Sequence, residues 1–589
     1  MVSVKNSISI KIGGQAGYGI MSTGAILGKA CSRGGLNVCC DIQYPSLIRG
    51  GHNSYLLRIS EEPIYSFNRD VDLLVALNRE TIDLHKKELT KGSAVIYDGD
   101  VVKCSKKELG KNVFLVSVPL SKIANEHGGE VMRNTVSLGT VIGLTGYDFN
   151  LLAGVIKEVF KDKSSEVIEQ NIGAAKAGYN YVKKKLPKKF GYKLKASKKP
   201  KKRMFITGNE ATAVGAIKAG CKFFAMYPMT PATSILHYLA SKEREYGMVV
   251  RQAEDELAVM NMAVGAGHAG VRSMVATSGG GFCLMVEALG MAGMTETPVV
   301  VIDGQRGGPS TGLPTHTEQA DLKFAINASQ GEFVKIVIAP GDETECFYKV
   351  GEALNLAEKY QVPVVILLDK HLGEIPNTCN MFDQSKIKVD RGKILTEKKV
   401  LASKTKDFFK RYAITKDGVS PRVLPGTKGG MFVANSYEHD EAGNLAEDEL
   451  TRNRMVDKRM AKMAYILEEL PKPEVYGPKN ADLTIIGWGS TKRAIMEAIK
   501  MLDKEGIKVN YLQVFYMKPF KSKEVAEIIK SAKHTLLVEN NRTSQLAGVI
   551  KENTGLDVNF VLNKYSGRPF YPEEIIGKVK EVLKHGKHR

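Results

Sequence analysis

Three short segments carry side chains that could bind a keto acid and activate a cofactor. They are residues 227–233 (Tyr-Pro-Met-Thr-Pro-Ala-Thr), residues 252–256 (Gln-Ala-Glu-Asp-Glu) and residues 305–315 (Gln-Arg-Gly-Gly-Pro-Ser-Thr-Gly-Leu-Pro-Thr). A planar guanidinium such as that of Arg306 can donate two parallel hydrogen bonds to a carboxylate. Threonine hydroxyls can orient a keto group, and a buried glutamate can move a proton on a cofactor. The segments therefore predict a site for a carboxylate-bearing substrate and a cofactor.

Arg306 follows an apolar, strand-like run at residues 299–302 and precedes two glycines and a proline. The glycines let a ligand approach the backbone closely, and the proline stiffens the loop. A lone arginine is usually a surface charge, but an arginine held in such a loop favours a carboxylate site. His316 follows Thr315 at the end of this loop, and we expect it to support the site rather than to shuttle protons.

Alternating strand-like and helical patterns must position these segments. The expected strands lie at residues 223–226, 273–276, 299–302, 333–338 and 362–368, each followed by a turn and a helical pattern. Such alternation is typical of a parallel sheet, where ligands bind beyond the carboxyl ends of the strands. Residues 227–230, 277–281 and 303–315 follow three of these strands, so we expect them to meet at one edge.

Glu254, Asp255 and Glu256 stand where a helical pattern begins, just after a strand-like run at residues 248–250. Carboxylates at a helix start commonly cap the helix or interact with its dipole. A role in cofactor chemistry is the alternative, and residue types alone leave both open.

Together these motifs resemble those of the 2-oxoacid:ferredoxin oxidoreductases, in the form in which a γ domain is fused ahead of the α subunit. In that family one glutamate hydrogen-bonds the aminopyrimidine N1′ of thiamine diphosphate, and the resemblance assigns this role to Glu254. It assigns binding of the 2-oxoacid to Thr230, Arg306 and Thr315. It implies that the cofactor cavity is lined by Tyr227, Pro228, Thr277, Ser278 and Gly279. Gly280 stands where the family has proline, so we expect a more permissive backbone there.

Residues 44–53, Tyr-Pro-Ser-Leu-Ile-Arg-Gly-Gly-His-Asn, resemble the γ-domain signature, which in the family lies towards the coenzyme A side of the active site. The resemblance makes Arg49 a candidate for a cofactor phosphate or for a salt bridge between domains, and arginine suits both roles. Residues 13–19 form a glycine-rich turn into a helical pattern, which favours phosphate. The dinucleotide fingerprint fails there because Ser22 replaces its third glycine, and this disfavours NAD.

The complete chain predicts an α/β protein with three doubly wound domains. Residues 1–182 alternate strand and helix patterns, which predict a parallel sheet covered on both faces, and the resemblance assigns them to the γ domain. We expect a basic linker at residues 183–203, and the resemblance implies a domain of the thiamine-diphosphate pyrimidine-binding type at residues 204–380. Residues 381–475 lose regularity and predict an extended connection. Residues 476–589 resemble the transketolase C-terminal domain.

The net charge of +20 is unevenly distributed. Residues 183–203 contain eleven lysines, one arginine and no acid. Prolines and a glycine interrupt this stretch, and its apolar content is low, so we expect a solvated linker. The alternative is an electrostatic docking strip for an acidic partner such as ferredoxin. The stretch matches no nucleic-acid-binding fold, so we expect no nucleic-acid partner.

The eight cysteines show no Cys-x-x-Cys spacing, so we expect reduced thiols rather than ligands of zinc or of an iron–sulfur cluster. No run of about 18 apolar residues occurs, so we expect no membrane partner. The N-terminal residues lack the pattern of a signal peptide, and we expect a cytoplasmic protein.

The family's β subunit carries a Gly-Asp-Gly type motif for diphosphate and magnesium together with the cluster cysteines, and neither is found in this sequence. The resemblance therefore implies thiamine diphosphate and magnesium shared with a separate β subunit, and an iron–sulfur cluster in that partner only. It also implies coenzyme A as co-substrate and ferredoxin as electron acceptor. No metal-ligating residues are expected in this chain itself.

The implied reaction is oxidative decarboxylation of a 2-oxoacid to acyl-CoA and CO2. 2-Oxoglutarate, pyruvate and branched-chain 2-oxoacids would all present the same carboxylate and keto group to Arg306. The resemblance to the fused γα layout favours 2-oxoglutarate or a broad range of 2-oxoacids, with pyruvate or a branched-chain 2-oxoacid as alternatives. A basic scaffold protein that docks acidic partners is a rival of another class. A CoA-dependent transferase or ligase built on the glycine-rich first domain is a second rival.

Overall fold

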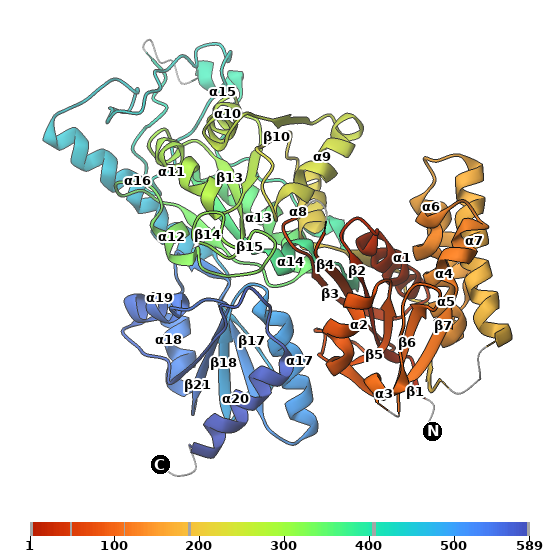
Figure 1. The fold of residues 1–589 in the computed structure, drawn as a ribbon. Coiled ribbons are helices and arrows are strands. Elements are labelled where there is room, and N and C mark those ends of the chain that lie inside the picture. Colours follow the sequence, from red (N-terminus) through yellow and green to blue (C-terminus); the bar gives the residue numbers. More distant parts are fainter. Residues whose placement is uncertain (1–3, 48–49, 111, 186–189, 403–407, 586–589) are drawn as a thin grey trace. The chain divides into compact units, whose positions relative to one another are not determined.

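The computed structural model describes residues 4–47, 50–110, 112–185, 190–402 and 408–585. Contacts group the chain into two compact units. The first unit comprises Met1–Ile206, Ile375–Met381 and Tyr571–Glu573, and the second comprises Thr207–Glu374, Phe382–Phe570 and Glu574–Arg589. Figure 1 labels the elements of both units.

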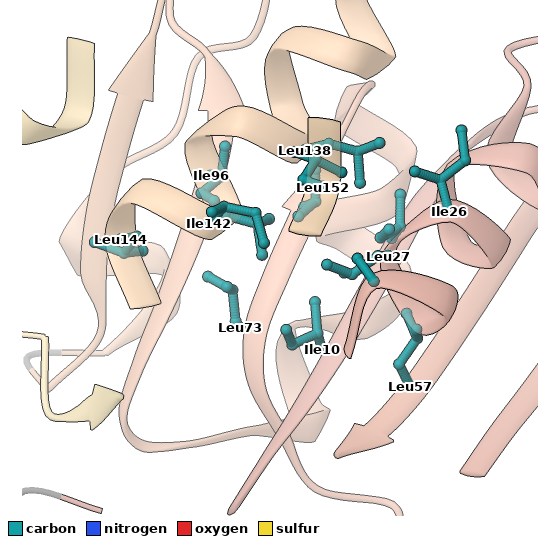
Figure 2. Packing of buried hydrophobic residues seen from close by; sticks show 14 of the residues in the cluster. Ile10, Ile26, Leu27, Leu57, Leu73, Ile96, Leu138, Ile142, Leu144 and Leu152 are labelled. Atoms are coloured by element: carbon teal, nitrogen blue, oxygen red, sulfur yellow. The ribbon is translucent and has the colours of Figure 1, made fainter. Parts of the chain in front are cut away.

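An eight-stranded sheet forms the first unit, in the order β7-β6-β5-β2-β4-β3-β16-β9. Its strands are β2 (Ser7–Gln15), β3 (Asn37–Gln43), β4 (His52–Ser60), β5 (Val71–Ala76), β6 (Leu89–Asp98), β7 (Phe114–Val118), β9 (Arg203–Ile206) and β16 (Asn377–Asn380). Its helices are α1 (Ile20–Arg33), α2 (Arg79–His85), α3 (Lys106–Leu109), α4 (Leu120–Asn125), α5 (Arg133–Thr145), α6 (Phe149–Val159) and α7 (Ser165–Lys185). Figure 2 shows the core, in which Ile10, Leu57 and Leu73 of neighbouring strands face Leu27 of α1 and Ile142 of α5.

The sheet of the first unit is mixed rather than parallel throughout. Strands β2, β5, β6 and β7 run parallel as expected. Strand β4 runs antiparallel to both β2 and β3. The connection between β3 and β4 is too short for the crossover that parallel neighbours need, which explains the antiparallel pairing. The predicted α/β class is confirmed.

The basic segment at residues 183–203 is not simply a solvated linker. Helix α7 continues to Lys185, and strand β8 (Tyr192–Lys193) pairs with β1 (Val4–Lys5). Phe190 and Leu194 are buried in the core of the first unit. Apolar residues at alternate positions suit a strand with one buried face, a pattern that the lysines obscured. Residues 195 and 198–202 keep the expected exposed lysines.

Strand β9 lies at the start of the range expected for the second domain, residues 204–380, but it pairs with β16 in the sheet of the first unit. Strand β16 comes from a segment more than 170 residues further along the chain, so no local pattern indicates this pairing.

The second unit holds two sheets. The seven-stranded sheet has the order β11-β10-β12-β13-β15-β14-β20, and the five-stranded sheet has the order β17-β19-β18-β21-β22. The strands are β10 (Phe223–Met226), β11 (Val249–Gln252), β12 (Ser273–Thr277), β13 (Val299–Gln305), β14 (Ile336–Ile338), β15 (Pro363–Asp369), β17 (Glu474–Tyr476), β18 (Leu483–Gly487), β19 (Val509–Gln513), β20 (Tyr516–Lys518), β21 (Thr535–Glu539) and β22 (Phe560–Asn563). Strand β20 follows β19 in the chain but adds antiparallel to β14, which ties the two sheets together.

Helices pack against these sheets and include the one that carries the glutamate segment. They are α8 (Gly208–Lys218), α9 (Thr233–Tyr246), α10 (Glu256–His268), α11 (Gly279–Met294), α12 (Leu322–Asn327), α13 (Glu343–Tyr360), α14 (Lys370–Glu374), α17 (Thr491–Lys504), α18 (Ser522–Ser531), α19 (Gln545–Thr554) and α20 (Pro572–His585). The apolar runs of β12, β13 and β15 are completely buried, as parallel strands covered on both faces require.

The segment from residue 381 to residue 475 is mostly irregular, as expected, apart from α15 (Glu397–Ala402) and α16 (Glu449–Glu469). Helix α16 contributes Lys458 and Lys462, which bind the buried Glu296. These ammonium groups lower the pKa of Glu296 against the opposing effect of burial. The buried ion cluster attaches the connection to the seven-stranded sheet domain.

Candidate active site

The candidate segments follow four neighbouring strands of the seven-stranded sheet. Strands β11, β10, β12 and β13 are adjacent in that order and parallel. Tyr227 follows β10 directly, Ser278 follows β12, Arg306 follows β13, and Glu254 comes two residues after β11. The carboxyl ends of parallel strands lie at the same edge of a sheet, so the expected convergence is confirmed.

Arg306 is half-buried and directly linked to the Tyr-Pro-Met-Thr-Pro turn. Its Nη1 donates a hydrogen bond of 2.8 Å to the carbonyl oxygen of Thr230. Burial lowers the pKa of Arg306, and the nearby carboxyl group of Asp321 opposes this effect. A partly desolvated guanidinium with free donors is suited to a carboxylate ligand.

The turn around Thr230 is held by a close approach of three strand ends. Asn209 Nδ2 donates a hydrogen bond of 2.8 Å to the carbonyl oxygen of Pro231. A β-carbon on Gly304 would lie 3.3 Å from both Pro231 Cγ and the Thr277 carbonyl oxygen. Glycine at position 304 therefore allows the turn to pack against β12 and β13.

Thr315 lies on the returning limb of the Arg306 loop. The limb is fixed where the Gly307 N–H donates to the His316 carbonyl oxygen at 3.2 Å and the Leu313 N–H donates to the Gly307 carbonyl oxygen at 2.7 Å. The Thr315 hydroxyl is buried and lies 3.0 Å from His316 Nδ1. Burial, Arg568 and Lys370 together lower the pKa of His316, so its neutral form is favoured.

The Thr277-Ser278-Gly279 segment is a strand end followed at once by a helix. Thr277 and Ser278 are completely buried, and α11 begins at Gly279 without an intervening loop. Within the described residues, the Ser278 hydroxyl has no hydrogen-bond partner. Gly280 is exposed in the first turn of α11, so the expected permissive loop is instead helical. Tyr227 is 40% exposed beside this edge, and Pro228 is partly exposed.

The three carboxylates of the Gln-Ala-Glu-Asp-Glu segment have different environments. Asp255 caps α10, where its Oδ1 accepts a hydrogen bond of 2.8 Å from the Ala258 N–H. Glu256 is buried, and its Oε1 has no hydrogen-bond partner in the described part of the chain. Glu254 is exposed, contrary to the expectation of a buried glutamate.

Three further acids near Arg306 were not singled out from the sequence. Asp303 is completely buried, and neither of its carboxylate oxygens has a hydrogen-bond partner among the described residues. Burial and the neighbouring Asp321 raise its pKa well above the usual range. Burial also raises the pKa of Asp321 to about 6, and it raises the pKa of Glu318. The sequence signal that could have identified Asp303 is its position directly after the apolar run at residues 299–302.

Arg49 lies outside the described residues, so only its neighbours can be placed. His52 opens β4, and its Nε2 lies 2.9 Å from Nε2 of His85. Burial, His85 and Lys11 lower the pKa of His52 to about 4. In the glycine-rich turn, Gly13 and Gly14 still belong to β2, and Gly19 precedes α1 in a left-handed conformation.

No cluster of three or more histidine, cysteine or acidic side chains suited to a metal ion occurs in the part of the chain that the structure describes. The helices described are likewise too short or too polar to cross a membrane.

Three family models match successive parts of the chain. Residues 9–181 match "Pyruvate ferredoxin/flavodoxin oxidoreductase", residues 214–458 match "Pyruvate flavodoxin/ferredoxin oxidoreductase, thiamine diP-bdg", and residues 481–575 match "Pyruvate:ferredoxin oxidoreductase core domain II". The last two models therefore cover the two sheets of the second unit apart from strand β17.

Relatives match over nearly the full length of the chain. A 2-oxoacid:ferredoxin oxidoreductase subunit alpha from a Sulfolobus species is 34% identical, with 99% of this chain and 98% of the relative covered. The 2-oxoglutarate oxidoreductase subunit KorA of Mycobacterium tuberculosis is 31% identical, with 98% and 92% covered.

A solved structure also matches nearly the full length of the chain. The 2-oxoglutarate:ferredoxin oxidoreductase from Magnetococcus marinus, with 2-oxoglutarate, coenzyme A and succinyl-CoA bound, aligns with a TM-score of 0.90 and 34% identity, covering 98% of this chain and 100% of that chain. With the strand-edge site and the three successive domain matches, this likeness shows that the chain belongs to the 2-oxoacid:ferredoxin oxidoreductase family, as an α subunit with a γ-like domain, a thiamine-diphosphate-binding domain and a core domain II.

Proposed function

We propose that this α subunit binds the carboxylate of a 2-oxoacid through Arg306 and contributes Glu254 to a thiamine diphosphate site completed by a separate β subunit. The observation that carries the proposal is the 2.8 Å hydrogen bond between Arg306 and Thr230 at the strand edge that also bears Glu254. Family membership excludes the alternatives of a basic scaffold and of a CoA-dependent transferase or ligase.

Arg306, Thr230 and Thr315 would hold the substrate. The guanidinium uses one nitrogen on the Thr230 carbonyl oxygen, which leaves its other N–H groups for a bidentate contact with a carboxylate. The Thr230 and Thr315 hydroxyls would then orient the keto group.

Glu254 would act on the pyrimidine half of the cofactor. Its exposed carboxylate makes no contact that would occupy it within the described residues, and Gly280 has open space around its α-carbon. This environment fits a flat pyrimidine ring lined by Tyr227, Pro228 and the segment from Thr277 to Gly279. Thiamine diphosphate, when bound with magnesium, supplies a carbon nucleophile for keto groups. Glu254 would hold a proton shared with pyrimidine N1′.

The remaining partners follow from family membership. The β subunit would hold the diphosphate, the magnesium ion and the iron–sulfur cluster, and ferredoxin would accept the electrons. Coenzyme A would take the acyl group, and Arg49 of the γ-like domain is the candidate contact for one of its phosphates. The eight free thiols favour a reducing compartment, and we propose a cytoplasmic location.

We favour 2-oxoglutarate as substrate. Gly567 packs against His316, which adjoins Thr315, so Arg568 is a second cation near the Arg306 loop. A dicarboxylate would gain from this second cation, whereas pyruvate and branched-chain 2-oxoacids offer no second charge. The relatives named for 2-oxoglutarate support the same choice.

The test is steady-state kinetics of the chain assembled with its β subunit, using ferredoxin or a dye as acceptor. With coenzyme A present, kcat/KM for 2-oxoglutarate should exceed that for pyruvate by about tenfold or more, as the loss of one charged contact predicts. A preference for pyruvate or a branched-chain 2-oxoacid would select that alternative. Absence of activity with every 2-oxoacid would refute the proposed function.

A further inference from the structure

The segment from Thr317 to Asp321 joins the Arg306 loop to the C-terminal sheet. Its acidic residues face the loop, and the polar atoms of Gln319 between them face the ends of strands β18 and β21. The position of this segment therefore allows it to influence the orientation of the Arg306 side chain.

The side that faces Arg306 is built from two carboxylates. Glu318 accepts a hydrogen bond from the Gly308 backbone, two residues after Arg306. The Asp321 N–H donates to Gln305 Oε1 at 3.1 Å, and a β-carbon on Gly279 would lie 2.6 Å from Asp321 Oδ2. The Asp321 carboxylate thus lies against the first residue of α11, where the helix dipole favours a negative charge.

Asp321 is connected to Arg306 through the residue that precedes the arginine. The Asp321 N–H is bonded to the side chain of Gln305, and the Asp321 carboxylate attracts the guanidinium without an ion pair within 4 Å in the described part of the chain. The guanidinium can therefore be oriented by Asp321 while its outer edge stays available to a ligand.

On the side that faces the C-terminal sheet, the side chain and the backbone of Gln319 each donate and accept a hydrogen bond. Gln319 Nε2 donates to the Trp488 carbonyl oxygen at 2.9 Å, and Gln319 Oε1 accepts from the Asn540 N–H at 3.0 Å. Its backbone N–H donates to the Asn540 carbonyl oxygen at 2.8 Å, and its carbonyl oxygen accepts from Asn541 Nδ2 at 2.9 Å. Gln319, Asn540 and Asn541 are all buried, so these bonds are shielded from water.

We propose that Asp321 is a positioning residue for Arg306, and that its segment is anchored through Gln319 to the C-terminal sheet, so that this sheet sets the affinity of the arginine for a 2-oxoacid. The proposal rests on the proposed role of Arg306. It gives the C-terminal domain, which supplies none of the candidate site residues, a defined part in substrate binding.

Asp321→Asn in the assembled complex tests the central step, because asparagine keeps the shape and removes the charge. We expect the KM for 2-oxoglutarate to rise about tenfold with kcat changed by less than about twofold, since only binding geometry is affected. Glu332→Gln is the matched control, because Glu332 is an exposed acid of the same unit.

The pH profile distinguishes positioning from packing. The pKa of Asp321 is raised to about 6, so its charge is present above that pH and is lost as the pH falls through it. In the wild type, kcat/KM should fall below about pH 6, and Asp321→Asn should lack this inflection and remain at the low value. Asp303 on β13, Cys283 on α11, Glu318 and Arg306 face Asp321, and all remain in the variant.

Asn541→Ala tests the anchor without touching the arginine site. Loss of the bond to the Gln319 carbonyl oxygen should raise KM by about threefold, as for one neutral hydrogen bond. Asn553→Ala is the control, because among the described residues the Asn553 side chain bonds only to the Val549 carbonyl oxygen within its own helix.

An unchanged KM, or a retained inflection in the pH profile of Asp321→Asn, would overturn the proposal. A parallel loss of kcat and thermal stability would also overturn it, because it would show that Asp321 has a structural role. If Arg306→Lys left KM unchanged, the proposed carboxylate site itself would fail, whatever the Asp321 variant showed.

Discussion

The guanidinium of Arg306 donates one hydrogen bond to the Thr230 carbonyl oxygen, and the Asp321 N–H is bonded to the side chain of the preceding Gln305. The motif that contains Arg306 could be recognised in the sequence. An arginine that follows an apolar strand and precedes glycines and a proline is a chemically distinctive pattern. The acids that surround Arg306 could not be recognised, because Asp321 and Glu318 come from a later polar run whose path no periodicity indicates.

Arg306→Lys should raise the KM for the 2-oxoacid while thiamine diphosphate still binds. Lysine keeps the charge but loses the planar pair of donors, at a cost of about 2 kcal/mol on the scale of charged hydrogen bonds, or about thirtyfold in KM. Steady-state kinetics of the assembled complex measure this, with cofactor binding followed separately. An unaltered KM would remove Arg306 from the substrate site.

Glu254→Gln should lower kcat by about a hundredfold or more with little change in KM, because the amide cannot share a proton with the cofactor pyrimidine. Exchange of the thiamine C2 proton into deuterated water, read by NMR, should slow accordingly. Glu332→Gln is the matched control, since Glu332 is an exposed acid of the same unit outside these segments and should leave exchange unaltered. Exchange at the wild-type rate in Glu254→Gln would reduce Glu254 to a carboxylate at a helix start.

The sequence identified the three acids at positions 254–256 as candidates, but it could not determine which of them acts on the cofactor. The family motif selected Glu254, whereas the expectation of burial fitted Glu256. Which side chain turns outward depends on how α10 packs on β11 and α11, and this is a tertiary property.

At the level of elements, helical and strand positions around the site were largely predictable from apolar runs and turns. Strands β10, β12, β13, β14 and β15 all lie within the expected runs or extend them by a few residues. The departures are pairings across long distances, such as β9 with β16, and the start of α11 directly at Gly279. A helix start without a capping side chain carries little sequence signal.

Gly280→Ala tests the helical assignment of that segment. Gly280 lies in the first turn of α11, and a β-carbon added there would meet no atom of the described residues within 4 Å. Alanine should stabilise the unit by about 0.5 to 1 kcal/mol, seen as a higher thermal midpoint. Gly281→Ala is the contrasting variant, because its β-carbon would collide with the Thr277 hydroxyl and the Glu256 carboxylate and should lower the midpoint. Equal effects of the two substitutions would contradict the helix start at Gly279.

At the level of the whole molecule, Arg306 and Glu254, the proposed contacts for substrate and cofactor, follow strands at one sheet edge, and family membership makes the chain one subunit of a larger enzyme. The strand and helix patterns indicated three α/β regions separated by a basic stretch and an irregular stretch, and three family models match successive parts of the chain. The patterns did not predict that the basic stretch would place Phe190 and Leu194 in a core.

The exposed lysines of that stretch provide a test of ferredoxin docking. Replacing Lys198, Lys199, Lys201 and Lys202 with glutamine should leave folding intact, because all four are exposed. If they steer ferredoxin, its association rate should lose part of its dependence on salt, which is screened over about 10 Å at 0.1 M. Stopped-flow mixing at several salt concentrations measures this, and an identical salt dependence would assign the lysines to solubility alone.

The most direct test of the account is reconstitution of the enzyme from separately purified chains. We predict that this chain alone and the β subunit alone do not reduce ferredoxin, and that mixing them with thiamine diphosphate and magnesium gives reduction that requires both 2-oxoglutarate and coenzyme A. Arg306→Lys in the same mixture should restore the rate only at raised 2-oxoacid concentration. Ferredoxin reduction by this chain without a partner, or none from the mixture with any 2-oxoacid, would contradict the account.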